Sequence, residues 1–196
     1  KNLNGISHFL EHMCFKGTTK RPRPIDIASE LDGLGAEYNA FTAREYTSYY
    51  AKVKNESFHH ALDIVSDLYL HPAFSPVEIE KEKGVIVEEI NMYEDLPQRR
   101  VSEFFMELVY GDQPAGWSVA GEKDVVRRIM RDDFLKYRGA HYLPQATTVV
   151  IAGGFDVEKA KEDVQAHFCV IGEGKKDGKP KVVEEQKGPK ELIRFK

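Results

Sequence analysis

Hydrophobic positions recur at helical spacing from the first residues of the chain onward. The first predicted helix covers Leu3–Phe15, and Gly17 follows it as a residue type that commonly ends helices. The apolar residues of this helix share one face: Leu3, Ile6, Leu10 and Met13. Cys14 falls on the same side, so we expect it to be a small core residue rather than a metal ligand.

Seven later stretches also predict helices. They cover Pro24–Leu31, Glu56–Leu70, Ser75–Tyr93, Pro97–Tyr110, Glu122–Ile129, Asp133–His141 and Asp156–Phe168. The clearest helix start lies at Ser75, because Pro76 suits a first turn and Glu78 completes a capping box. Helices therefore dominate the predicted secondary structure.

Three segments rich in aromatic and β-branched residues predict strands. Ala36–Ala40 and Tyr46–Val53 flank a polar turn and predict a hairpin, and Ala146–Ala152 predicts a buried strand. Gly172–Gly188 is rich in Gly and Lys and predicts a linker, after which Leu192–Phe195 would begin another strand. Because helices and strands alternate without a regular βαβ rhythm, the pattern favours an α+β fold with a mostly antiparallel sheet.

The composition narrows the classes of function. The chain has 196 residues, of which 41% are hydrophobic, and this suits one substantial domain with its own core. The formal charge is only −4 and no long basic run occurs, so we expect no nucleic-acid partner. No apolar run approaches the roughly 18–20 residues of a membrane span, so we expect no membrane partner. Two cysteines are too few for a disulfide scaffold and fit a reducing compartment.

The stretch His8-Phe9-Leu10-Glu11-His12 carries the strongest chemical signal. On a helix with 3.6 residues per turn, His8, Glu11 and His12 project from one face. Two imidazoles at this spacing can bind one Zn²⁺, and the carboxylate between them can take a proton from metal-bound water. The motif therefore predicts one zinc ion per chain and a zinc-dependent hydrolase, and it favours a peptidase.

A catalytic zinc site usually has three protein ligands, so a third must come from elsewhere. In the helix predicted for Ser75–Tyr93, Glu82 and Glu89 are seven residues apart and share the edge of the buried stripe, whereas Glu88 points to the opposite side. We expect Glu89 to be the third ligand and Glu82 to fix the tautomer of a ligand histidine. A Glu-rich face is also typical of a plain solvent-exposed helix, so that alternative stays open here.

The motif belongs to a longer run with a family resemblance. His-x-x-Glu-His reverses the commoner His-Glu-x-x-His order and is typical of inverzincins. The run from Gly5 to Thr18 resembles the pitrilysin family of zinc metallopeptidases, specifically its mitochondrial-processing-peptidase-like branch. Residues 39–47, residues 82–90, Gly121 and Tyr142–Pro144 fit the family as well, so the resemblance covers nearly the whole chain.

The resemblance implies a role for each matched residue of the motif segments. It implies that His8, His12 and Glu89 bind zinc. It further implies two catalytic carboxylates: Glu11 as the general base and Glu82 as the supporting group behind a ligand. These assignments agree with the argument from helical geometry.

The resemblance also implies a substrate site and a fold. Asn39, Ala40 and Phe41 match the substrate-edge hairpin of the family, along which an extended peptide would add as a strand. The implied fold is α+β, with a mostly antiparallel sheet of about six strands and helices packed on it. Family members carry residues before the metal helix that supply strands of this sheet, so we expect those strands to be missing from this chain.

Members of the family also carry a second, similar half that closes over the substrate. We therefore expect residues 1–171 to form a catalytic zinc-binding half-domain, and residues 172–196 to form a linker and the start of a strand toward an absent second half. The expected partners are an extended peptide and a second homologous half-domain or subunit, with a homodimer as one arrangement.

The sequence thus predicts a zinc-dependent endopeptidase that cleaves extended peptides or presequences, with Glu11 as the general base. The alternative is a non-catalytic scaffold subunit of a processing-peptidase-like complex. Because all five key side chains are present, we favour activity of the intact protein, and we expect weak or no turnover from the chain alone. The expected location is the bacterial cytoplasm, with the mitochondrial matrix as the alternative.

Overall fold

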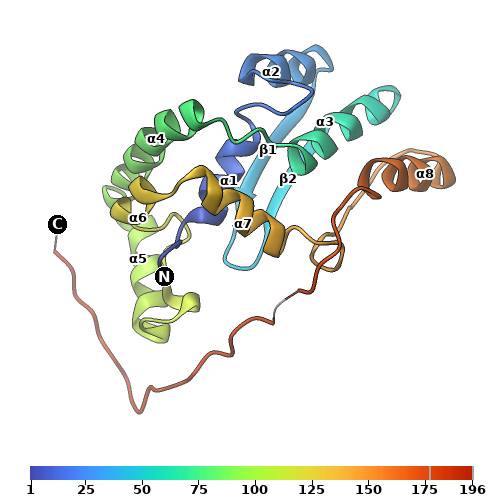
Figure 1. The fold of residues 1–196 in the computed structure, drawn as a ribbon. Coiled ribbons are helices and arrows are strands. Elements are labelled where there is room, and N and C mark those ends of the chain that lie inside the picture. Colours follow the sequence, from blue (N-terminus) through green and yellow to red (C-terminus); the bar gives the residue numbers. More distant parts are fainter. Residues whose placement is uncertain (177, 196) are drawn as a thin grey trace.

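The computed structural model describes residues 1–176 and 178–195, and this part of the chain is largely helical (Figure 1). Its α-helices are α1 (Ile6–Cys14), α2 (Pro24–Gly33), α3 (Phe58–Leu70), α4 (Pro76–Glu94), α5 (Pro97–Tyr110), α6 (Lys123–Arg128), α7 (Arg131–His141) and α8 (Val157–Phe168). Each predicted helix is present, with its ends within three residues of the expected positions. Within the described residues, no helix combines the length and the apolar character that a bilayer span requires.

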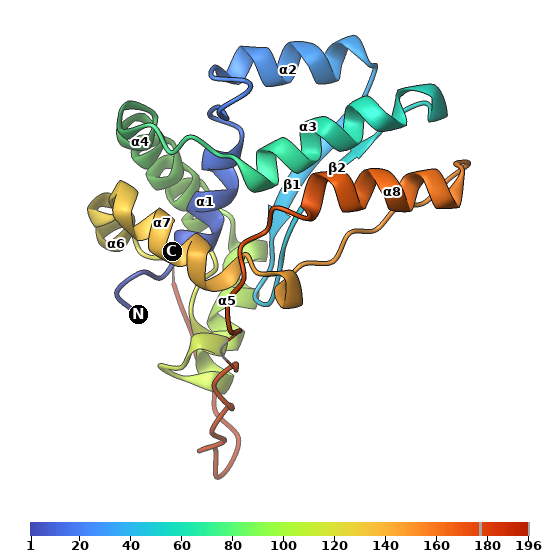
Figure 2. The same cartoon turned by 45° about the vertical axis from the view of Figure 1, so that its right-hand side comes forward.

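The sheet consists of one antiparallel hairpin, formed by β1 (Glu37–Thr42) and β2 (Thr47–Lys52). Thr42 lies opposite Thr47 at the turn, and Glu37 lies opposite Lys52 at the open end. Helix α1 packs against both strands and α3 packs against β2, so the hairpin lies between the metal-motif helix and α3. Figure 2 shows α8 running alongside α3.

The prediction of a mostly antiparallel sheet of about six strands is wrong. Among the described residues, β1 and β2 are the only strands in a sheet. In the predicted strand Ala146–Ala152, Ala146 ends a short 3-10 helix (η3, Pro144–Ala146), residues 147–152 form no strand pairing, and Val150 is 81% exposed. The predicted strand at Leu192–Phe195 is also absent. A β-branched run fits a sheet only where a neighbouring strand supplies hydrogen-bond partners, and propensity alone cannot provide one.

A groove of about 450 Å³ lies between β2 and the segment from Thr147 to Phe155. Residues of α3 and Phe168 of α8 also line it. The unpaired segment therefore lies across a cavity from the hairpin instead of extending its sheet. Residues 178–195 form an extended segment outside the helices in Figure 1. It contacts the body at three points: Lys179 pairs with Glu45, the Val183 backbone pairs with the side-chain amide of Gln113, and Arg194 lies over the Phe104 ring.

Two apolar clusters form the core. The larger one joins α1, α4, α6 and α7, and its buried members are Ile6, Phe9, Leu10, Met13, Cys14, Phe74, Ile79, Ile86, Ile90, Ala120, Val126, Ile129 and Phe134. The smaller one lies between α2 and α3 and contains Ile27, Leu31, Ile64 and Leu68. Phe15 contacts both clusters, so the end of α1 is fixed from two sides. The prediction that Cys14 is a core residue is confirmed, since it is fully buried.

Two glycines set where α1 begins. Gly5 caps the helix with φ of 92°, and Gly121 has φ of 81°. A Cβ on Gly5 would lie 2.6 Å from the Ala120 carbonyl oxygen, and one on Gly121 would lie 2.5 Å from that of Asn4. The two backbones therefore approach more closely than a side chain would allow. Because the φ of Gly5 lies in the left-handed region, Gly5 cannot continue α1, and the helix starts at Ile6 rather than at Leu3.

The loop after α1 is fastened by a buried guanidinium. Arg21 is 2% exposed and binds Glu30 through two parallel hydrogen bonds of 3.0 and 2.8 Å. It also donates to Asp63 at 2.7 Å and to Asp67 at 2.8 Å. One cation thus ties the loop that follows α1 to both α2 and α3.

Candidate metal centre

Helices α1 and α4 bring the predicted metal ligands together. His8 and His12 lie one turn apart on α1, and Glu89 lies near the end of α4. The apolar faces of the two helices meet in the larger core cluster, through residues such as Phe9 and Ile86, both fully buried. The polar edge of α4 that carries Glu89 therefore lies against the imidazoles, while Glu88 faces solvent as predicted.

Three donor atoms form a nearly equilateral triangle. His8 Nε2 lies 3.2 Å from His12 Nε2, and Glu89 Oε2 lies 3.5 and 3.4 Å from these two nitrogens. A tetrahedral Zn²⁺ with bonds of about 2.0–2.1 Å separates its ligand atoms by about 3.3 Å. The donor set and its spacing fit this ion without rearrangement. The three side chains are 12%, 20% and 21% exposed, so the site is shielded but reachable.

The Nδ1 atom of His12 contacts a carboxylate that is itself paired with a lysine. His12 Nδ1 lies 2.9 Å from Glu82 Oε1, and Lys16 Nζ lies 2.7 Å from Glu82 Oε2. Donation from Nδ1–H to Glu82 fixes the tautomer that leaves Nε2 free for a metal. His8 lacks this support, because its Nδ1 is buried without a hydrogen-bond partner among the described residues.

The electrostatic environment separates the protonation states of the three groups. Burial lowers the pKa of His8. Burial also acts against charge on His12, but hydrogen bonds to Glu82 and Glu89 outweigh it and raise the pKa of His12 to about 9. The hydrogen bond from His12 lowers the pKa of Glu89 to about 2 despite partial burial. Near pH 7 the metal-free site therefore holds an anionic Glu89, a neutral His8 and a protonated His12 that a metal must deprotonate.

Glu11 lies beside this triangle without belonging to it. The potential ligand set among the described residues consists of His8, His12 and Glu89. Burial raises the pKa of Glu11, and a hydrogen bond from Thr42 Oγ1 to Glu11 Oε2, 2.5 Å long, acts in the opposite direction. A carboxylate near a metal but not bound to it is suited to accept a proton from attacking water.

The predicted substrate residues lie on β1. Asn39 and Phe41 are exposed, and Ala40 is half-buried between them. The backbone N–H of Ala40 donates to Asn39 Oδ1 at 2.8 Å, and Phe41 meets Tyr46 edge to face. β1 pairs with β2 along one edge only among the described residues. The opposite edge is therefore open to a further strand, and the substrate role of these residues stays a prediction.

Sequence reasoning missed three side chains that contact the site. Tyr93 lies four residues after Glu89 on α4, so the i,i+4 rule could have found it. Lys16 lies in the turn after α1 and contacts Glu82 on α4, a long-range pair with no local signal. Thr42 lies 31 residues from its partner Glu11, and the hairpin that joins them gives no local signal.

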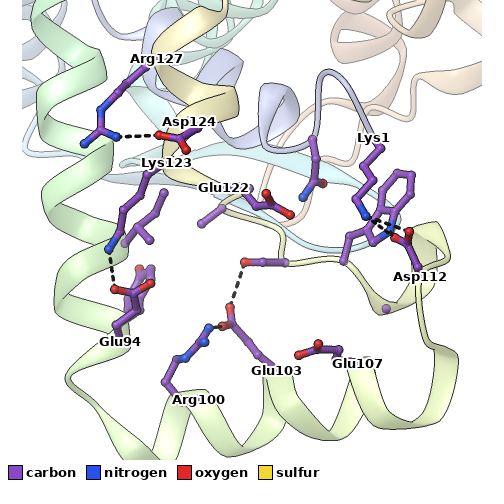
Figure 3. Close-up of a pocket in the computed structure, with 18 of the residues that line it drawn as sticks. Lys1, Glu94, Arg100, Glu103, Glu107, Asp112, Glu122, Lys123, Asp124 and Arg127 are labelled. Atoms are coloured by element: carbon purple, nitrogen blue, oxygen red, sulfur yellow. Dashed lines mark hydrogen bonds and ion pairs between the residues drawn. The ribbon is translucent and has the colours of Figure 1, made fainter.

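A polar cavity of about 710 Å³ lies next to the metal site but is separate from it (Figure 3). It is bounded by α4, α5, α6 and the segment that leads into α6, and many of its charged groups are paired, such as Lys123 with Glu94. Tyr93 is among the residues that line it, whereas His8, His12 and Glu89 are not. Donor geometry, rather than cavity size, therefore locates the candidate centre.

Comparison with known proteins identifies the family. The model of the insulinase family, peptidase family M16, matches residues 1–123. The protein named uncharacterized zinc protease YmxG from Bacillus subtilis (strain 168) is 42% identical over 164 residues, which cover 80% of this chain and 40% of that protein. The chain therefore belongs to the insulinase family, and the family resemblance inferred from its motifs is confirmed.

Solved structures share the fold. The crystal structure of the first half of the periplasmic protease PqqL from Escherichia coli aligns with a TM-score of 0.80 at 20% identity, over 94% of this chain and 41% of that chain. Pitrilysin aligns with a TM-score of 0.82 at 20% identity, over 93% of this chain and 20% of that chain. The chain spans about 40% of the length of the curated relatives it matches.

Proposed function

We propose that this chain is the catalytic part of a zinc metalloendopeptidase, in which His8, His12 and Glu89 bind one Zn²⁺. The observation that carries the proposal is the triangle of donor atoms with sides of 3.2–3.5 Å. The names of family relatives such as the zinc protease from Bacillus subtilis support both the metal and the reaction class.

Amide hydrolysis requires an activated water molecule and an acid for the leaving amine. Zinc, when bound, lowers the pKa of water and polarises the scissile carbonyl. Glu11 accepts the proton of the attacking water and then delivers it to the departing nitrogen. Thr42 holds the Glu11 carboxylate through the bond to Oε2, which leaves the other oxygen for the proton transfer.

The substrate is an extended peptide. Its backbone adds to the open edge of β1 beside Asn39, Ala40 and Phe41, so main-chain hydrogen bonds hold it with little regard for sequence. Thr42 follows directly in the same strand and donates to Glu11, so a peptide paired along β1 passes close to the general base. This continuity between strand and base supports β1 as the docking edge.

The proposed enzyme also requires a second half. In this proposal a homologous half-domain or subunit closes over the bound peptide. The fold match to the first half of PqqL supports such an arrangement. A protein that lacks this second half is expected to bind zinc but to turn over peptides slowly, because the second half supplies one wall of the active site.

The test combines metal analysis with peptide cleavage in the intact protein. Glu89→Gln should lose zinc, whereas Glu88→Gln, one position away on the solvent side, should keep it. Glu11→Gln should retain zinc and lose hydrolysis of a quenched fluorescent peptide. Equal zinc content in the Glu89 and Glu88 variants would refute the ligand assignment. Zinc binding without any hydrolysis by the intact wild type would favour a scaffold subunit instead.

A further inference from the structure

The two carboxylate oxygens of Glu89 have different partners. Oε2 faces the imidazoles, at 3.5 Å from His8 Nε2 and 3.4 Å from His12 Nε2. Oε1 accepts a hydrogen bond of 2.5 Å from the phenol hydroxyl of Tyr93. The carboxylate is therefore held with one oxygen toward the candidate zinc position and the other turned away from it.

The phenol is itself fixed by two helices. Tyr93 lies one turn after Glu89 on α4, a spacing that stacks the two side chains on one face. From α5, the guanidinium carbon of Arg99 lies 4.7 Å from the centroid of the Tyr93 ring. This cation–π contact limits rotation of the ring, so the hydroxyl is held in place before any metal binds.

We propose that Tyr93 is a positioning residue that makes Glu89 a one-oxygen ligand of zinc. This inference rests on the proposed function. By donating to Oε1, the phenol keeps that oxygen off the metal and orients Oε2. A carboxylate free to rotate can instead bind through both oxygens and take up the coordination position that water requires. Tyr93 thus preserves an open position as well as affinity, without touching substrate or metal.

The test is the substitution Tyr93→Phe, which removes the hydroxyl and keeps the ring under Arg99. Groups that orient a metal ligand typically change metal affinity about 10–100-fold, so we expect the zinc Kd of the intact protein to rise by that factor. The Co²⁺-substituted protein should show weaker visible absorption as the site moves from four toward five ligands. The metal-free protein should stay folded and lose no more free energy of unfolding than this one hydrogen bond to a carboxylate contributes.

Tyr110→Phe is the matched control, because it removes the hydroxyl of a half-buried tyrosine at the end of α5. It should leave both the Kd and the Co²⁺ spectrum unchanged. A wild-type Kd and spectrum in Tyr93→Phe would overturn the inference and leave the proposed function intact. A loss of affinity with a wild-type Co²⁺ spectrum would also overturn it, because the number of ligands would then be unchanged. Failure of the wild type to bind zinc would overturn both.

Discussion

Replacing Glu82 with Gln should weaken zinc binding strongly at high pH and much less at neutral pH. Glu82 Oε1 lies 2.9 Å from His12 Nδ1, and its side chain is only 5% exposed, so water cannot take its place. Loss of a carboxylate behind a ligand histidine typically costs about 10–100-fold in metal affinity, or about 1.4–2.8 kcal/mol. The full loss of zinc affinity can be measured only at a pH where protons do not compete with zinc for His12.

Below pH 9 a proton does compete. The pKa of His12 in the metal-free site is about 9, so at pH 7 about 99% of this residue is protonated and the apparent zinc affinity falls about 100-fold. The competition disappears as the pH rises through 9. Glu82→Gln keeps an amide oxygen that can accept from His12 Nδ1–H but removes the negative charge that raises this pKa, so the variant carries a smaller proton penalty at pH 7. The ratio of the variant's zinc Kd to that of the wild type should therefore be about fivefold or more smaller at pH 7 than at pH 9.

Competition titration against a chromogenic zinc chelator at pH 7, 8 and 9 measures both effects. Glu78→Gln, in the first turn of the same helix, is the control and should match the wild type throughout. Equal deficits at all three pH values would show that Glu82 does not set the protonation of His12. Equal zinc affinity of the variant and the wild type at pH 9 would show that Glu82 does not stabilise the metal site.

Three further substitutions test the fold and the base. Thr42→Val removes the donor to Glu11, and kcat for peptide hydrolysis should fall about tenfold with zinc content unchanged; an unchanged kcat would contradict this role. Arg21→Met removes the cation paired with the buried Asp67, and urea unfolding should show a loss of about 3–5 kcal/mol in the free energy of unfolding, whereas a loss below about 1 kcal/mol would contradict the argument. Gly121→Ala forces a Cβ to within 2.5 Å of the Asn4 oxygen and should lower stability by about 1–3 kcal/mol, while Gly84→Ala on the open face of α4 should not.

The sequence alone predicted the helices well because their signals are local. Apolar residues repeat with the period of one helical turn, and breakers such as Gly17 and Gly111 stand near the ends. The same geometry placed His8 and His12 on one face and separated Glu89 from Glu88. These conclusions depend only on backbone geometry within a single helix, which the chain specifies without reference to distant residues.

The strands show the limit of that reasoning. The run Ala146–Ala152 has the composition of a buried strand, yet in the described chain it pairs with no neighbour and its Val150 is exposed. The hairpin residues from Glu37 to Lys52 met their partner because it is adjacent in sequence. A strand is stable only in a ladder, so its formation is a property of two segments rather than one.

At the metal centre, too, the sequence determined some features and the tertiary packing determined the others. Residue spacing determined which side chains of each helix could serve as ligands, and it did so before any coordinates. Only the packing of α1 on α4 decided that Glu89 Oε2 lies within 3.5 Å of both imidazoles. Packing likewise brought Thr42 to Glu11 and Lys16 to Glu82. Distances between helices follow from how their buried side chains interlock, and no periodicity along one segment encodes that fit.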